Sequence, residues 1–110
     1  MIPYPIIYTD AMADYQGGYT KGPLVYIRPK YKGDQGLIAH EVYGHALMWW
    51  LTLGLIGLLN YWRPVRLWSE VRAFKIQMKY GLSLEKAAEF LCRPNYDFHL
   101  TIDEAKEMLK

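Results

Sequence analysis

The stretch DQGLIAHEVYGHALMWWL, residues 34–51, determines the fold that we expect for this chain. It begins with Asp34, a residue type that commonly caps the N-terminus of a helix. An apolar-rich segment follows over about residues 37–51 and contains two histidines, His40 and His45. We therefore predict a helix that carries both imidazoles.

The motif HEVYGH, residues 40–45, places His40 and His45 five positions apart. On a regular helix, positions i and i+5 lie roughly 140° apart, so the two imidazoles could not bind one ion. A single π-type turn absorbs the extra residue and returns both rings to one face, and Gly44 has no side chain to crowd it. The alternative is a regular helix in which Glu41 and His45, at i and i+4, pair without a metal.

A second predicted helix carries Glu70. Pro64 in its first turn and Gly81 just past its end mark its limits. Its buried stripe consists of apolar residues at helical spacing, namely Leu67, Val71, Phe74 and Met78. Glu70 falls at the margin of this stripe, where a carboxylate is costly unless it is paired or binds a metal. Arg72 lies on the opposite side of the helical wheel and is expected to be solvated.

Together, His40, His45 and Glu70 match the ligand set of a catalytic zinc site, two histidines and one glutamate with one position open for water. We therefore predict that these residues bind one Zn²⁺ ion. Glu41 is next to a ligand but is not needed as one, so we predict that it is the general base.

The first third of the chain is expected to form short strands. Leu24–Arg28 is a β-branched and aromatic run, and Ile6–Tyr8 is a weaker candidate. Pro23 and Pro29 flank the better strand and cannot donate to a ladder, so we place that strand at a sheet edge.

Two short helices are expected to close the chain. One follows Ser83 and stops at Pro94, and the other begins at the capping box of residues 101–104. The predicted fold class is therefore α+β: short N-terminal β-strands, a zinc-binding helix, a glutamate-bearing helix and two short C-terminal helices.

Composition limits the class of protein. A chain of 110 residues is long enough for one domain, which we take to be residues 1–110. The chain has 13 basic and 11 acidic residues and no basic run, so we expect no nucleic-acid partner. The single cysteine excludes an internal disulfide and a multi-cysteine zinc site. We recognise no signal peptide and expect a cytoplasmic location by default, and the oligomeric state stays open.

The uncharged segment 46–62 is the nearest approach to a membrane span. Its length, about 17 residues, is at the lower limit for crossing a bilayer, and Gly54, Gly57 and Asn60 interrupt it. We expect a helix end and an apolar turn packed into the core. Contact of 46–62 with a membrane or a partner is the alternative.

Two motifs resemble known zinc peptidases. HEVYGH matches the H-E-x-x-G-H motif of the dipeptidyl peptidase III family, and SEVRA, residues 69–73, resembles that family's E-E-C-R-A motif. The second glutamate of that motif binds zinc and corresponds to Glu70. In layout, residues 19–110 resemble the minigluzincins and small phage-encoded gluzincin-like domains, in which a strand precedes a zinc-binding helix and a second helix carries a glutamate ligand. Those small domains have H-E-x-x-H, and this chain has one residue more.

The resemblance implies a gluzincin-type zinc metallopeptidase that acts on a peptide or protein substrate. The expected mechanism is hydrolysis by a metal-activated water, with the substrate extended along Leu24–Arg28. Tyr43 and His99 are weaker candidates for a side chain that steadies the transition state. The alternative is a zinc-binding structural or interaction module, phage-derived, that is catalytically weak or inactive.

Overall fold

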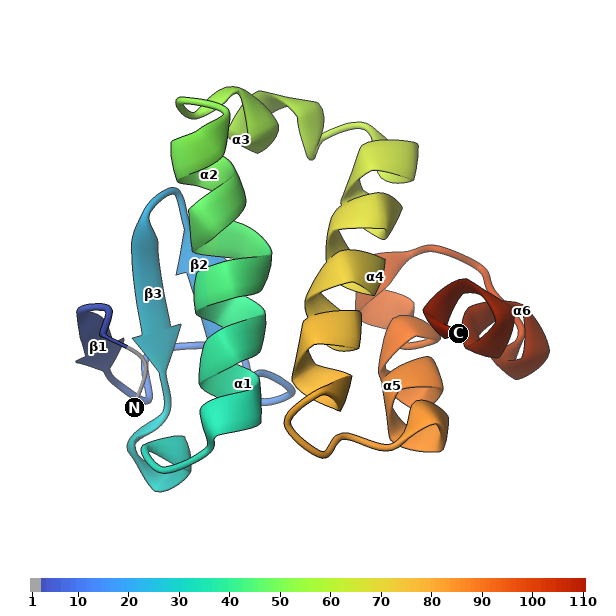
Figure 1. Ribbon diagram of the computed structural model, residues 1–110, viewed down its shortest axis with the longest axis horizontal. Coiled ribbons are helices and arrows are strands. Elements are labelled where there is room, and N and C mark those ends of the chain that lie inside the picture. Colours follow the sequence, from blue (N-terminus) through green and yellow to red (C-terminus); the bar gives the residue numbers. More distant parts are fainter. Residues whose placement is uncertain (1–2) are drawn as a thin grey trace.

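The computed structural model describes residues 3–110 and shows a small sheet beside several helices, which confirms the predicted α+β class (Figure 1). The three strands are β1 (Ile6–Tyr8), β2 (Gly18–Lys21) and β3 (Leu24–Ile27). Their order is β1-β3-β2, with β1 parallel and β2 antiparallel to β3.

Strands β1 and β3 lie where the sequence predicts them, but the edge position predicted for β3 is wrong. β3 is the central strand. Pro23 precedes it and Pro29 follows it, so neither proline interrupts its ladder. The edge beside the helices belongs to β2, which the sequence pattern does not reveal because Gly17 and Gly18 weaken its strand signal.

The predicted histidine-bearing helix is continuous but not uniform. It comprises α1 (Gln35–Ala39), the π-helical segment η2 (His40–Ala46) and α2 (Leu47–Leu51). The Asp34 carboxylate accepts a hydrogen bond from the Leu37 N–H at 3.0 Å and caps the helix as expected.

The remaining elements are α3 (Leu55–Leu59), α4 (Arg63–Met78), α5 (Leu84–Leu91), α6 (Ile102–Leu109) and two 3₁₀ turns, η1 (Pro29–Tyr31) and η3 (Pro94–Tyr96). Helices α4, α5 and α6 confirm the sequence predictions, including the capping box of Thr101 and Glu104. Helix α3 forms where we predicted only an apolar turn. The prediction that this segment packs into the core is also wrong, because most of its large side chains are exposed and only Ile56 of α3 is buried. Within residues 3–110, no helix has both the length and the apolar character needed to cross a membrane.

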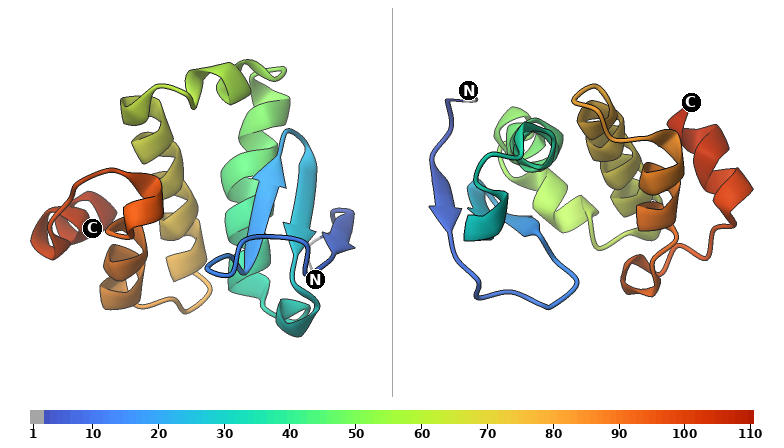
Figure 2. Two further views of the ribbon diagram at one scale, coloured as in Figure 1. Left: turned by 180° about the vertical axis from the view of Figure 1, so that it is seen from behind. Right: turned by 90° about the horizontal axis from the view of Figure 1, so that it is seen from below.

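Two apolar clusters lie on either side of the contact between η2 and α4. The first, between the sheet and α1–η2, contains Val25, Ile27, Ile38, Val42 and Ala46. The second, among α4, α5 and α6, contains Phe74, Ala87, Ala88, Leu91, Phe98, Ala105 and Leu109. Figures 1 and 2 show the resulting layers: the sheet, the α1–α2 helix, α4, and then α5 with α6. The buried polar side chains His40, Glu41 and Ser69 belong to η2 and α4, so polar groups gather between the two cores.

Candidate metal centre

The π-helical segment η2 brings the two histidines, five positions apart, to one face of the helix. The N–H of Leu47, at its end, bonds to the carbonyl of Val42, five residues earlier. This is the π-type turn that a shared site requires, and it excludes the regular helix in which Glu41 and His45 would pair. The prediction of a π-type turn is confirmed.

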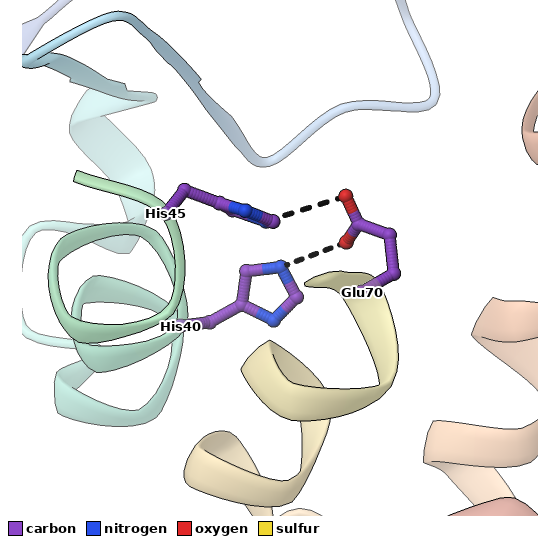
Figure 3. Close-up of side chains that lie close together, drawn as sticks. All are labelled: His40, His45 and Glu70. Carbon is purple, nitrogen blue, oxygen red and sulfur yellow. Dashed lines mark ion pairs between the residues drawn. The ribbon is translucent and has the colours of Figure 1, made fainter. Parts of the chain in front are cut away.

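Figure 3 shows that His40 and His45 point from η2 toward one carboxylate, that of Glu70 on α4. His40 Nε2 is 3.4 Å from Glu70 Oε1, and His45 Nε2 is 3.3 Å from Glu70 Oε2. Each residue offers one ligand atom, and these atoms lie within 4.8 Å of one another. His40, His45 and Glu70 therefore form a group that could hold a metal ion, as predicted.

The hydrogen bonding around this group is incomplete. His45 Nδ1 lies 3.2 Å from Ser69 Oγ, so a neighbour on α4 orients that ring. Within residues 3–110, His40 Nδ1 and Glu70 Oε1 are buried without a hydrogen-bond partner. A buried carboxylate oxygen without a partner is costly, and a bound cation would remove that cost.

The charges of the group are strongly coupled. Burial alone would lower the pKa of His45, but the carboxylate of Glu70 outweighs it and raises that pKa to about 9. Burial alone would raise the pKa of Glu70, but the charge of His45 and the close approach of both imidazoles hold that pKa well below its usual range. The raised pKa of His45 and the lowered pKa of Glu70 favour an ion pair between these two side chains at neutral pH.

Helix α4 also holds the π-type turn in place. A Cβ atom on Gly44 would lie 2.5 Å from the Cβ of Ala73, so the absence of a side chain there lets η2 and α4 touch. Arg72 Nη1 donates to the carbonyls of Tyr43 at 2.6 Å and Gly44 at 3.0 Å. The prediction that Arg72 is solvated is wrong, because its long side chain reaches back to η2.

Glu41 lies beside the three candidate ligands. Its side chain is 6% exposed, and its Oε2 atom is 4.0 Å from His40 Nε2. Its Oε1 atom accepts a hydrogen bond from Thr20 Oγ1 at 2.9 Å. Because Thr20 belongs to β2, the edge strand fixes one carboxylate oxygen and leaves the other near the candidate ligands.

A cleft of about 450 Å³ opens onto the group, with β2, the α2–α3 corner, α4 and η3 in its walls. Tyr96 of η3 lines it and stacks on Phe98, with ring centroids 5.4 Å apart. Burial and the charges of Glu70 and Glu41 raise the pKa of Tyr96, so its phenol stays protonated and can donate a hydrogen bond. Asn60 also lines the cleft, and its Oδ1 atom is buried without a partner within residues 3–110.

The two weaker candidates lie outside this cleft. Tyr43 packs against the apolar cluster beside the sheet, and His99 is exposed and pairs with Asp97 at 2.7 Å. Tyr96 was not among the predicted site residues, because it lies in a 3₁₀ turn where no helical or strand periodicity marks a residue. Its position between Pro94 and Phe98 is the one signal that the sequence offers.

Comparison of the chain with protein-family models, with curated proteins and with solved structures finds no match. The candidate metal centre is thus defined by the positions of His40, His45 and Glu70 in this structure.

Proposed function

We propose that this chain is a zinc-dependent peptidase. The observation that carries the proposal is the convergence of His40, His45 and Glu70, with the carboxylate of Glu41 beside them. Two histidines and one glutamate are a common ligand set of catalytic zinc. Ligand atoms about 2.0–2.1 Å from a tetrahedral zinc ion lie about 3.4 Å apart. Glu70 contacts the two imidazoles at 3.4 and 3.3 Å through its two separate oxygens, and the set with one ligand atom from each residue lies within 4.8 Å, somewhat wider than that spacing.

Zinc held by these ligands would polarise a peptide carbonyl and lower the pKa of a water molecule. Glu41 accepts a proton from the attacking water and delivers it to the amine that leaves. The hydrogen bond from Thr20 supports this role, because it holds one oxygen of Glu41 and leaves the other near the ligands. Tyr96 offers a phenol at the cleft wall that can donate to the oxygen on which negative charge develops.

The peptide substrate binds along β2 and not along β3. Both sides of β3 are already paired, whereas β2 is an edge strand whose residues Gly18, Tyr19 and Thr20 line the cleft. An extended peptide can add to such an edge through main-chain hydrogen bonds. Asn60 also lines the cleft, and its buried Oδ1 atom has no hydrogen-bond partner within residues 3–110.

A second candidate function is a zinc-binding structural module without efficient turnover. One observation favours it: the group joins η2 and α4 between two separate apolar clusters, where a metal would tie the two cores together. In that case, the metal would stabilise the fold, and Glu41 would serve only to pair with Thr20.

Metal analysis and peptidase assays on three variants separate these functions. For the peptidase, we expect the unaltered chain to contain about one zinc ion and to hydrolyse a mixture of unstructured peptides. Glu41→Gln should keep the zinc and lose about a hundredfold to ten-thousandfold in rate, because it removes the general base. Tyr96→Phe should keep the zinc and lose a smaller part of the rate, while Glu89→Gln on the exposed face of α5 should change neither.

Zinc retention without hydrolysis in any peptide mixture would favour the structural module. Absence of zinc binding altogether would remove both functions and leave His45 and Glu70 as an ion pair.

A further inference from the structure

An apolar tip, defined here as residues 50–62, projects at one end of the molecule around α3 (Figure 1 and Figure 2, left). Its large apolar side chains are exposed to an unusual degree, with Leu53 at 89%, Tyr61 at 86% and Leu58 at 70%. The others in this group are Trp50, Leu51, Leu55, Leu59 and Trp62. Such a concentration of exposed leucine and aromatic side chains marks an interaction surface.

The backbone of the tip turns sharply at its most exposed residue. Leu53 has a φ angle of 52°, in the left-handed region that commonly ends a helix. The N–H groups of Leu53 and Gly54 bond to the carbonyls of Trp50 at 3.3 Å and Trp49 at 2.8 Å, so this turn terminates α2. The Leu53 side chain is almost fully exposed at this turn, where an aliphatic side chain is free to contact another surface.

The tip has few polar groups for a specific protein partner. Thr52 Oγ1 already donates to the Met48 carbonyl at 2.8 Å and accepts from the Ile56 N–H at 3.1 Å. The indole N–H of Trp50 donates to the Tyr4 hydroxyl at 3.0 Å. A surface with its polar groups used internally and its leucines exposed suits hydrocarbon better than a hydrogen-bonding interface.

The charged side chains next to the tip are mainly basic. No acidic residue occurs from position 46 to position 69, and Arg63 and Arg66 directly follow the tip. The Arg63 side chain is 53% exposed and forms a surface ion pair with Asp97 at 3.4 Å, whereas Arg66 donates to the Tyr96 carbonyl at 3.1 Å. Trp50, Tyr61 and Trp62 lie at the ends of the apolar run, and tryptophan and tyrosine favour the boundary between headgroups and acyl chains. A leucine-rich centre, aromatic flanks and neighbouring arginines together match an anionic lipid surface.

We propose that the apolar tip is an interfacial anchor that inserts into the surface of an anionic lipid bilayer. Helix α3 has five residues and lies at the surface without spanning the bilayer. Ile56, Gly57 and Asn60 also line the cleft, so the anchored molecule holds one wall of its cleft at the membrane. The anchor does not depend on the proposed peptidase activity. If the chain is both anchored and a peptidase, its substrate would be a peptide segment close to a membrane surface.

The test is co-sedimentation of the full chain with vesicles. One set contains phosphatidylcholine alone, and the other contains phosphatidylcholine and phosphatidylglycerol in a ratio of roughly three to one. We expect binding to the anionic vesicles with a blue shift of tryptophan emission. The double variant Leu53→Ser, Leu58→Ser should lower the vesicle affinity at least about tenfold. Arg63→Gln should lower it by about fivefold, on anionic vesicles only.

The matched control is Ile102→Ser, which replaces a 41% exposed isoleucine on α6, away from the tip. It should bind vesicles like the unaltered chain. Because Leu53 and Leu58 are exposed, the double variant should keep its unfolding temperature, and Tyr61→Ser provides a second, independent tip variant.

The proposal is overturned if neither vesicle set binds, if neutral and anionic vesicles bind equally, or if Ile102→Ser loses as much affinity as the tip variants. It is also overturned if the chain forms a dimer that the double variant converts to a monomer, since a second copy would then cover the tip.

Discussion

The two helical segments that meet at the candidate metal centre differ in how they are built. Helix α4 is regular over its 16 residues, whereas η2 contains a π-type turn. The regular helix contributes Glu70 as a candidate ligand, Ser69 beside His45, Arg72 to the carbonyls of η2 and Ala73 against Gly44. The irregular segment thus places two histidines on one face, and the regular segment stabilises the irregularity.

The two motifs, HEVYGH in η2 and SEVRA in α4, therefore have different structural roles. In HEVYGH, the extra residue shifts the backbone hydrogen bonds from the regular helical pattern to a π-type pattern. Contacts from outside the turn must stabilise this less favourable backbone. In SEVRA, four of the five residues contact η2 or the candidate ligands. We therefore expect substitutions in SEVRA to alter metal binding even where the substituted side chain is not a ligand.

The largest effect is expected from Glu70→Ala. It removes one of three ligand groups. Loss of a residue that only hydrogen-bonds to a ligand typically lowers metal affinity by roughly 10–100-fold, so the loss of a ligand itself should lower zinc affinity by more. Added zinc should then no longer raise the unfolding temperature, because metal binding is coupled to folding. Equilibrium dialysis and thermal unfolding with and without zinc measure both effects. Glu89→Ala, at an exposed position on α5, serves as the control, and full zinc retention by Glu70→Ala would refute the ligand assignment.

A smaller but still large effect is expected from Gly44→Ala. The new Cβ would overlap Ala73 on a packed helix, and overpacking of this kind costs about 1–3 kcal/mol. Chemical denaturation should show this loss, together with weaker zinc binding as η2 moves away from α4. Gly33→Ala is the matched control, because nothing lies within 4 Å of a Cβ at that position.

The double variant Gly44→Ala, Ala73→Gly tests the cause. Ala73→Gly alone costs about 1 kcal/mol in a helix interior, so only a double variant that is more stable than the sum of the two losses supports direct steric contact. Simple additivity would show that Gly44 is needed for the turn itself.

The signals that predicted α4, α5 and α6 are local. Pro64 at the first turn, the hydroxyl of Ser83 and the capping box of Thr101 each act within three or four residues, and a sequence shows such contacts directly. The π-type turn was predictable for another reason. If His40 and His45 bind the same ion, their side chains must lie on one face, and a five-residue spacing does not allow this on a regular helix.

The errors concern contacts between distant segments. The position of β3 depends on β2, and β2 is identified by its pairing with β3 and not by its own residues. The position of Arg72 on a helical wheel describes where its Cα–Cβ bond points, but its guanidinium reaches carbonyls about 30 residues away in sequence. Tyr96 lines the cleft only because η3 folds back against α4.

Arg72→Met should have an intermediate effect. Methionine keeps an apolar stem but removes the Nη1 group that the carbonyls of Tyr43 and Gly44 share, a charged donor whose hydrogen bonding contributes about 1.5–3 kcal/mol. Zinc affinity should fall by about 10–100-fold, although Arg72 is not a ligand. The visible spectrum of the Co²⁺-substituted protein should also change if His40 and His45 are displaced. Lys75→Met on the same helix is the control, and an unchanged spectrum with full metal affinity would show that η2 keeps its turn without Arg72.

The effect that is smallest per step, up to about tenfold in zinc affinity for each pH unit, is expected from the titration of His45. Without metal, the pKa of His45 is raised from 6.5 to about 9 by Glu70, so the stability that this pair contributes is fully present below pH 6.5 and is lost as pH rises through about 9. A zinc ligand must be a neutral imidazole, so zinc binding at neutral pH should release about one proton from His45, and zinc affinity should increase with pH up to about 9. Titration calorimetry in two buffers of different ionisation enthalpy counts the released protons, and thermal unfolding of the metal-free chain across this range measures the opposite trend in stability. Zinc affinity that does not change between pH 6.5 and 9 would show that His45 is already neutral without the metal, and the ion pair with Glu70 would then not be the metal-free state.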